Sequence, residues 1–123
     1  LESAFAYMKE NLGQYLGHVF EDICIEYVRK HGYPKAGRWW KGPVGIDIVA
    51  SDDDSMLFAE CEYRDEPADA DLIDDLMDKS KNIGTRGLAA RYALFSKSGF
   101  TRTAEMRAEA VGVTLYKLDE IFR

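Results

Sequence analysis

Residues 44–64, VGIDIVASDDDSMLFAECEYR, constrain the fold most, because two apolar runs flank an acidic turn and each run carries carboxylates. β-Branched and aromatic residues bounded by turn residues predict two strands paired as a hairpin. With Asp53 and Asp54 at the tip of the turn, Asp47 on the first strand faces Glu60 on the second. The hairpin therefore brings two acidic residues together on a mostly apolar sheet.

Glu62 adds a third carboxylate, since residues two apart in a strand share a face. Like charges directly opposed across a sheet cost up to about 1 kcal/mol, and more when they lose contact with water. A divalent cation, a basic side chain or raised carboxyl pKa values would each compensate, and a solvated strand face is the ordinary alternative. Because carboxylate oxygens suit Mg²⁺ and Mn²⁺, the hairpin indicates a metal site as well as a fold.

The rest of the chain predicts further helices and strands around the hairpin. Apolar residues at spacings of three and four predict a helix from Leu16 to Lys30, which Gly13 and Gly17 separate from a short helical segment before them. The same criteria predict strands at 36–41, 88–95 and 113–116, helices at about 71–83 and 101–111, and a last helical turn at 118–122. The order αβββαβαβ predicts a single α/β domain, with a mixed central sheet flanked by helices.

Length and charge limit the classes of function. The 123 residues predict one domain over 1–123, and Leu1 in place of methionine indicates a fragment of a larger chain. The net charge of −6 counts against strong nonspecific binding of duplex DNA, although basic residues cluster between the first helix and the first strand. No apolar run reaches the roughly 18 residues of a membrane helix, so we expect a cytoplasmic protein with no membrane contact.

Two cysteines, Cys24 and Cys61, lack the spacing of metal ligands and are expected to be buried free thiols. Trp39 and Trp40 allow two interpretations. They could stack on nucleic-acid bases, or one ring could lie in the core and the other at an edge.

The order of elements, with Asp47 and Glu60-Cys61-Glu62 on adjacent strands, resembles the PD-(D/E)XK nuclease superfamily. The chain is also similar to a domain of uncharacterised function found C-terminal to archaeal and bacterial DEXX-box (P-loop) ATPases. That similarity rests on FEDIC, GRWW, GIDIVA, FAECEYR, LMDKS and FSKSGF, which together span most of the chain. The resemblance implies a restriction-endonuclease-like core and an N-terminal ATPase domain of the same chain as the expected partner.

The resemblance also implies a metal site for Mg²⁺ or Mn²⁺. Asp47 and Glu60 match the acidic ligands of the superfamily, and Cys61 would offer its backbone carbonyl. Glu21, on the first helix, matches the helical acidic residue that often completes the site.

The catalytic lysine of the superfamily is replaced here, because its position falls on Glu62. Some restriction endonucleases of the superfamily carry glutamate there, so Glu62 stays a catalytic candidate together with Asp47 and Glu60. Lys79 is a further candidate, since it borders the apolar face of the helix that follows and could point toward the sheet.

Two functions remain open. The first is a nuclease-like accessory domain of a multidomain ATPase that hydrolyses phosphodiester bonds of nucleic acid with Mg²⁺. The alternative is a catalytically inactive module that regulates, or that binds protein or nucleic acid, which the missing lysine and the acidic charge favour. The residues leave open whether the chain is an enzyme, and they leave its oligomeric state open.

Overall fold

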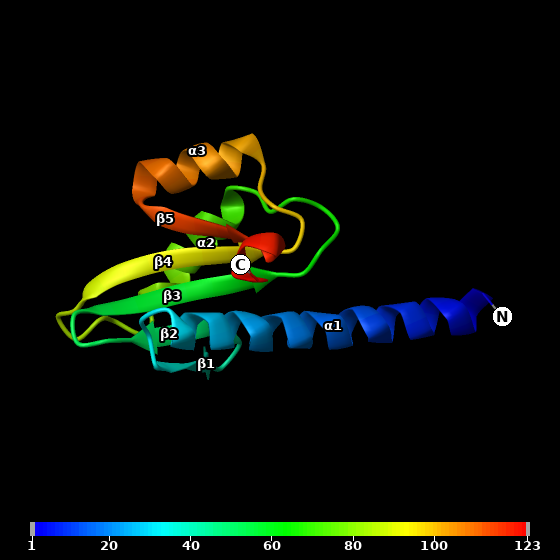
Figure 1. Ribbon diagram of the computed structural model, residues 1–123, viewed down its shortest axis with the longest axis horizontal. Coiled ribbons are helices and arrows are strands. Elements are labelled where there is room, and N and C mark those ends of the chain that lie inside the picture. The colour runs from blue at the N-terminus through cyan, green and yellow to red at the C-terminus, as the bar shows by residue number, and fades with distance from the viewer. Residues whose placement is uncertain (1, 123) are drawn as a thin grey trace.

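A five-stranded mixed sheet, in the order β1-β2-β3-β4-β5, forms the centre of the molecule (Figure 1). This computed structural model describes residues 2–122. The strands are β1 (Lys35–Lys41), β2 (Val44–Ser51), β3 (Ser55–Glu62), β4 (Ala89–Ser96) and β5 (Val113–Lys117). The helices are α1 (Glu2–Lys30), α2 (Asp71–Ser80), α3 (Arg102–Val111) and the 3₁₀ helix η1 (Leu118–Phe122). The predicted α/β fold, a mixed sheet flanked by helices in the order αβββαβαβ, is therefore confirmed.

The sheet changes from antiparallel to parallel pairing at β3. The first three strands pair as antiparallel neighbours through short turns, while β4 and β5 pair in parallel after the crossovers that contain α2 and α3. In the central hairpin, Ile48 pairs with Ala59 and Val49 with Phe58. This register is the one predicted with the turn at the tip of the acidic run.

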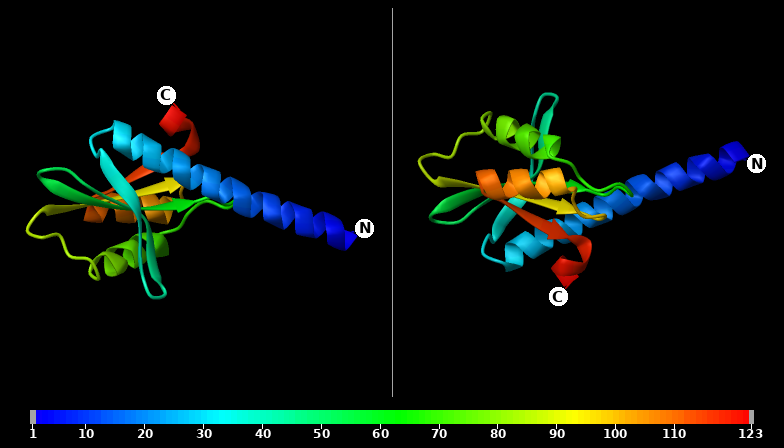
Figure 2. Two further views of the ribbon diagram at one scale, coloured as in Figure 1. Left: turned by 90° about the horizontal axis from the view of Figure 1, so that it is seen from below. Right: turned by 90° about the horizontal axis from the view of Figure 1, so that it is seen from above.

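Helices cover both faces of the sheet and create two apolar cores (Figure 2). On one face, Phe20 and Cys24 of α1 pack among buried residues of β2, β3 and β4. On the other face, Ile73 and Leu76 of α2 pack with Phe58 of β3 and with residues of α3 and β5. Because both faces are covered, a charged side chain in the part of a middle strand beneath the helices lies in largely dry surroundings, whereas Arg91 near the start of β4 is exposed.

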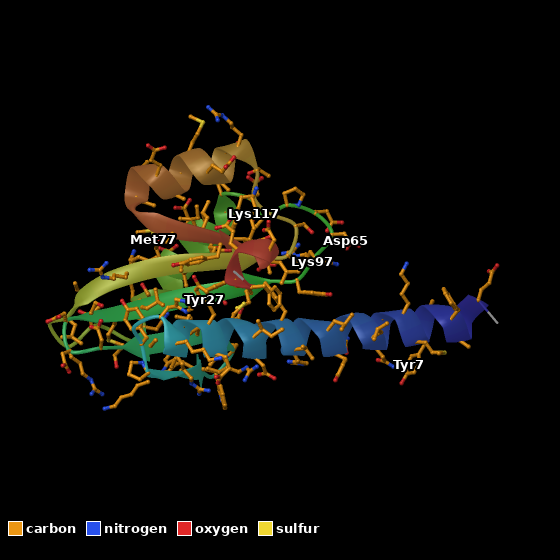
Figure 3. The ribbon with its side chains drawn as sticks, viewed as in Figure 1. Tyr7, Tyr27, Asp65, Met77, Lys97 and Lys117 are labelled. Atoms are coloured by element: carbon orange, nitrogen blue, oxygen red, sulfur yellow. The ribbon has the colours of Figure 1, made fainter. Side chains whose placement is uncertain are left out.

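Helix α1 is continuous from Glu2 to Lys30, so the predicted interruption at Gly13 and Gly17 is wrong. Glycine costs about 1 kcal/mol relative to alanine within a helix but keeps the backbone hydrogen bonds, so two isolated glycines did not end this one. The first half of α1 projects beyond the sheet, where Tyr7 lies apart from the other elements (Figure 3). Among residues 2–122, no helix has the length and apolar character needed to cross a membrane.

An irregularity in β2 changes which way its side chains face. The pairs Gly37–Val49 and Trp39–Ile46 leave two residues of β2 opposite the single residue Arg38 of β1, which is the pattern of a β-bulge. As a result, Ile46 packs in the α2 core, whereas Ile48, two residues later, packs in the α1 core. Asp47 is one of the two bulged residues.

Candidate acidic site

Two carboxylates join β2 to β3 at the place where their regular pairing ends. Beyond the pair Ile48–Ala59, the Asp47 backbone N–H donates to Glu60 Oε2 at 3.1 Å. The Cys61 backbone N–H donates in turn to Asp47 Oδ2 at 2.8 Å. Each carboxylate thus accepts a hydrogen bond from the opposite strand, and these bonds fix the positions of both acids.

Lys79, in the last turn of α2, supplies the positive charge next to these acids. Its Nζ lies 2.6 Å from Glu60 Oε1, and the two side chains are 38% and 11% exposed. The position follows from the sequence of α2, because Ile73 and Leu76 are fully buried against the sheet and Lys79 borders their face. The predicted orientation of Lys79 toward the sheet is therefore observed.

The charges of the site are strongly coupled. Burial, a hydrogen bond with Glu60 and the charge of Glu60 raise the pKa of Asp47 to about 8. Burial opposes the charge of Lys79, but the hydrogen bond to Glu60 and the charges of Glu60 and Asp47 prevail and raise the pKa of Lys79. A basic side chain and a raised carboxyl pKa, two of the three features predicted to offset the repulsion between the carboxylates of the hairpin, are thus present together.

Glu21 approaches the same site from α1, but an ion pair engages its carboxylate. Arg38 of β1 donates from Nε to Glu21 Oε1 at 2.7 Å and from a terminal nitrogen to Asp22 Oδ1 at 2.8 Å. The acidic cleft, an open hollow of about 240 Å³, is lined by Glu21, Arg38, Trp39, Trp40, Gly45, Ile46, Asp47, Glu60 and Lys79. Four of the residues predicted for the site therefore share one cleft.

The other two predicted residues are placed differently. Glu62 accepts a hydrogen bond from Arg64 Nε at 3.0 Å and lines a separate cleft with Pro67 and Leu72. Cys61 turns its side chain toward the α1 core, where a hydrogen bond with Cys24 and burial raise the pKa of its thiol. Both cysteines are free thiols, as predicted, but only Cys24 is buried and Cys61 is half-buried. Only the backbone of Cys61 reaches Asp47, and the ligand role of its carbonyl stays a prediction.

Arg38 and Trp40 also line the cleft, although the sequence did not single them out as site residues. Arg38 belongs to the cluster of basic residues before the central hairpin, and Trp40 belongs to the tryptophan pair. Those two signals were visible in the sequence. What connects them to the acids is the pairing of β1 with β2, which no local pattern reveals.

The donor set suits magnesium only in part. Within residues 2–122, no group of three or more His, Cys, Asp or Glu side chains is arranged to hold a metal ion. Asp47 and Glu60 are nevertheless two adjacent carboxylates in an open cleft, and Mg²⁺ is commonly held by one or two carboxylates together with waters and substrate phosphates. The residues present therefore fit a two-carboxylate site, with Glu21 held by Arg38.

Residues 1–73, more than half of the chain, match DUF234, a family described as archaea bacterial proteins of unknown function. The chain belongs to this family. Asp47, Glu60 and Glu21 lie within the matched residues, whereas Lys79 follows them.

This DUF234 member is similar to a small part of one relative and to most of another. An uncharacterized protein of Methanocaldococcus jannaschii is 33% identical over 103 residues, which cover 73% of this chain but only 23% of that protein. A UPF0102 protein of Dictyoglomus thermophilum is 26% identical over 107 residues, which cover 86% of this chain and 87% of that protein. Similar sequences therefore occur within a much longer chain and as most of a shorter one.

Among solved structures, a protein of unknown function is similar with a TM-score of 0.58 and 20% identity, covering 79% of this chain and 55% of that one. That likeness shows a shared fold. A repair endonuclease from Pyrococcus abyssi matches with a TM-score of 0.47 and 19% identity, covering 70% of this chain and 39% of that one.

The raised pKa of Asp47 predicts that the metal-free DUF234 member loses stability as the pH rises. An unfolded aspartate releases its proton near 3.8, whereas folded Asp47 keeps it until about 8, so the proton favours the folded state between these values. The free energy of unfolding should fall by up to about 1.4 kcal/mol for each pH unit in that window. Urea unfolding in EDTA at pH 5, 6, 7 and 8 measures the slope.

Asp47→Asn should remove most of this slope, because the amide cannot ionise and its oxygen can still accept the Cys61 N–H. Asp53→Asn, an exposed change at the tip of the same hairpin, is the matched control and should keep the slope. Equal slopes for Asp47→Asn and the unmodified chain would contradict the assignment.

Proposed function

We propose that this DUF234 member is a nuclease-like domain that hydrolyses phosphodiester bonds of nucleic acid with Mg²⁺ or Mn²⁺. The observation that carries the proposal is the contact of Lys79 Nζ with Glu60, 2.6 Å apart, in the cleft that also holds Asp47. Two carboxylates and a lysine are the side chains that the PD-(D/E)XK resemblance requires. Here the lysine comes from α2, and Glu62 occupies the strand position where the superfamily usually has its lysine.

In this proposal Asp47 and Glu60 hold the metal, which supplies Lewis-acid activation of water and of the phosphate. Lys79 keeps its proton, since its pKa is raised. It orients the attacking water or stabilises the negative charge that develops on the phosphate. Glu60 positions Lys79 through the same hydrogen bond, so one carboxylate serves both the metal and the lysine.

The proposed setting is an accessory domain within a longer chain that also contains an N-terminal ATPase domain. The Methanocaldococcus jannaschii relative supports a longer chain, because the matched residues cover only 23% of it. The ATPase partner rests on the resemblance of the sequence motifs, and a cytoplasmic location stays a prediction.

A catalytically inactive binding or regulatory module is the second candidate, and the ion pair of Glu21 favours it. Arg38 neutralises Glu21, the acid that the resemblance assigns to completing the metal site, without a metal ion. An acid whose charge a basic side chain offsets in this way needs no metal ion for that purpose, so the presence of the acids alone does not require catalysis.

Cleavage assays separate these candidates. The chain is incubated with single-stranded DNA, single-stranded RNA and supercoiled plasmid, each with Mg²⁺, with Mn²⁺ and with EDTA, and metal binding is followed by calorimetry. Metal-dependent cleavage that Asp47→Asn reduces to the level in EDTA supports the nuclease. Absence of both cleavage and metal binding would assign the domain to the inactive class.

A further inference from the structure

Trp40 is an exposed aromatic residue at the rim of the acidic cleft. Its exposure is 72%, whereas the preceding residue, Trp39, is half-buried and packs against the α2 core. The indole of Trp40 also lines a second cleft, next to the first, with Arg29, Gly37 and Arg38. Packing in the α2 core explains why Trp39 is an aromatic residue. No such packing explains the large apolar ring of Trp40, which lies in solvent between two clefts.

The surroundings leave this ring free to stack. Trp40 pairs across the strands with Gly45, which has no side chain, and a Cβ built there would lie 3.8 Å from the Cβ of Trp40. The ring contacts of residues 2–122 place no aromatic or cationic group against Trp40. The indole therefore presents a platform that no aromatic or cationic group of the described chain covers.

Cationic groups lie on both sides of Trp40. Arg38 bonds Glu21 and Asp22 through Nε and one terminal nitrogen, so its other terminal nitrogen can bind a phosphate. Lys79 lies in the acidic cleft, where it pairs with Glu60. Arg29 lies in the adjoining cleft, where its terminal nitrogens donate to Glu26 and to the Ala36 carbonyl. An aromatic platform flanked by cations is how proteins bind unpaired bases and the phosphates that join them.

We propose that Trp40 stacks on an unpaired base and that Arg38 binds an adjacent phosphate, so the acidic cleft takes single-stranded nucleic acid. This inference rests on the proposed function and names its class of substrate. A single strand offers the face of a base, whereas in a duplex neighbouring bases cover that face. The net charge of −6 also disfavours a duplex, whose binding depends mainly on neutralised phosphates.

Binding of labelled oligonucleotides in EDTA tests the proposal without any cleavage. Fluorescence anisotropy compares single-stranded DNA and RNA with a duplex of the same sequence, and we expect the single strands to bind more tightly. Trp40→Ala should weaken single-strand binding by about 5- to 150-fold, the loss expected for one stacked base. Trp40→Phe should recover part of the loss, since phenylalanine keeps an aromatic face.

Two controls isolate stacking. Tyr7→Ala removes an aromatic residue that is 66% exposed on the projecting half of α1, and it should bind like the unmodified chain (Figure 3). An oligonucleotide of abasic units keeps the phosphates and lacks the bases, so Trp40→Ala and the unmodified chain should bind it equally.

Several results would overturn the proposal. These are unchanged single-strand affinity in Trp40→Ala, tighter binding of duplex, or a change in self-association with no change in oligonucleotide binding. The last would assign Trp40 to a protein interface. Since the assay needs no catalysis, a chain that binds single strands but does not cut them would overturn the proposed nuclease and leave this inference standing.

Discussion

Lys79→Ala is expected to lower the rate of Mg²⁺-dependent cleavage by about 100- to 1,000-fold, the loss typical when one charged or hydrogen-bonding group that stabilises a transition state is removed. Lys79 is the cation that contacts Glu60 in the acidic cleft, and its raised pKa keeps it charged at neutral pH. Single-turnover rates with saturating enzyme measure the effect on the chemical step.

Lys81→Ala is the matched control, because Lys81 follows the end of the same helix and only forms a surface pair with Asp78 at 3.2 Å. Surface pairs of this kind contribute about 0–1 kcal/mol to stability, so the control should fold and cleave like the unmodified chain. Equal cleavage rates for Lys79→Ala and Lys81→Ala would show that Lys79 has no catalytic role. Urea unfolding of both variants separates a catalytic loss from a loss of folding.

Glu60→Gln is expected to reduce cleavage to the level in EDTA and to weaken Mg²⁺ binding by at least about 10-fold. Loss of residues that merely contact a metal ligand costs 10- to 100-fold, and Glu60 is proposed as a ligand itself. The glutamine oxygen can still accept the Asp47 N–H, so the join between β2 and β3 is kept. Isothermal calorimetry with Mg²⁺ and the cleavage assay give the two readouts.

Glu62→Gln is the matched control for Glu60→Gln, since Glu62 lies two residues along the same strand but outside the acidic cleft. Its partner Arg64 is 63% exposed, and both residues line a separate cleft. We expect this variant to bind Mg²⁺ and cleave like the unmodified chain. If Glu62→Gln loses activity and Glu60→Gln keeps it, the lysine-equivalent position is functional and the cleft is assigned wrongly.

The central pair of acids could be predicted from the sequence because short-range rules determine it. The acidic turn sets the register as far as the pair Ile48–Ala59, and this places the next residues, Asp47 and Glu60, beside each other although regular pairing ends there. Lys79 could be anticipated for a similar reason, since its distance along α2 from Leu72 and Leu76 places it at the border of the apolar face.

The rest depends on contacts between residues far apart in the chain. The bulge at Asp47 arises from the pairing of β2 with β1, and the ion pair of Glu21 joins α1 to Arg38, 17 residues later. Neither leaves a periodic signal. The break predicted in α1 failed for a different reason, because glycine lowers helix propensity without preventing the helix.

The hydrogen bonds that join β2 to β3 also bear on the evolution of the family. Asp47 and Glu60 each satisfy a backbone N–H of the opposite strand, so selection for a folded sheet alone would retain both acids. If a relative lacked the proposed nuclease activity, this structural role would still favour both acids, so their presence in a relative says little about activity. The Lys79 side chain satisfies no backbone group among residues 2–122 and pairs only with the Glu60 carboxylate, so a relative that keeps this lysine is the better candidate for the proposed activity.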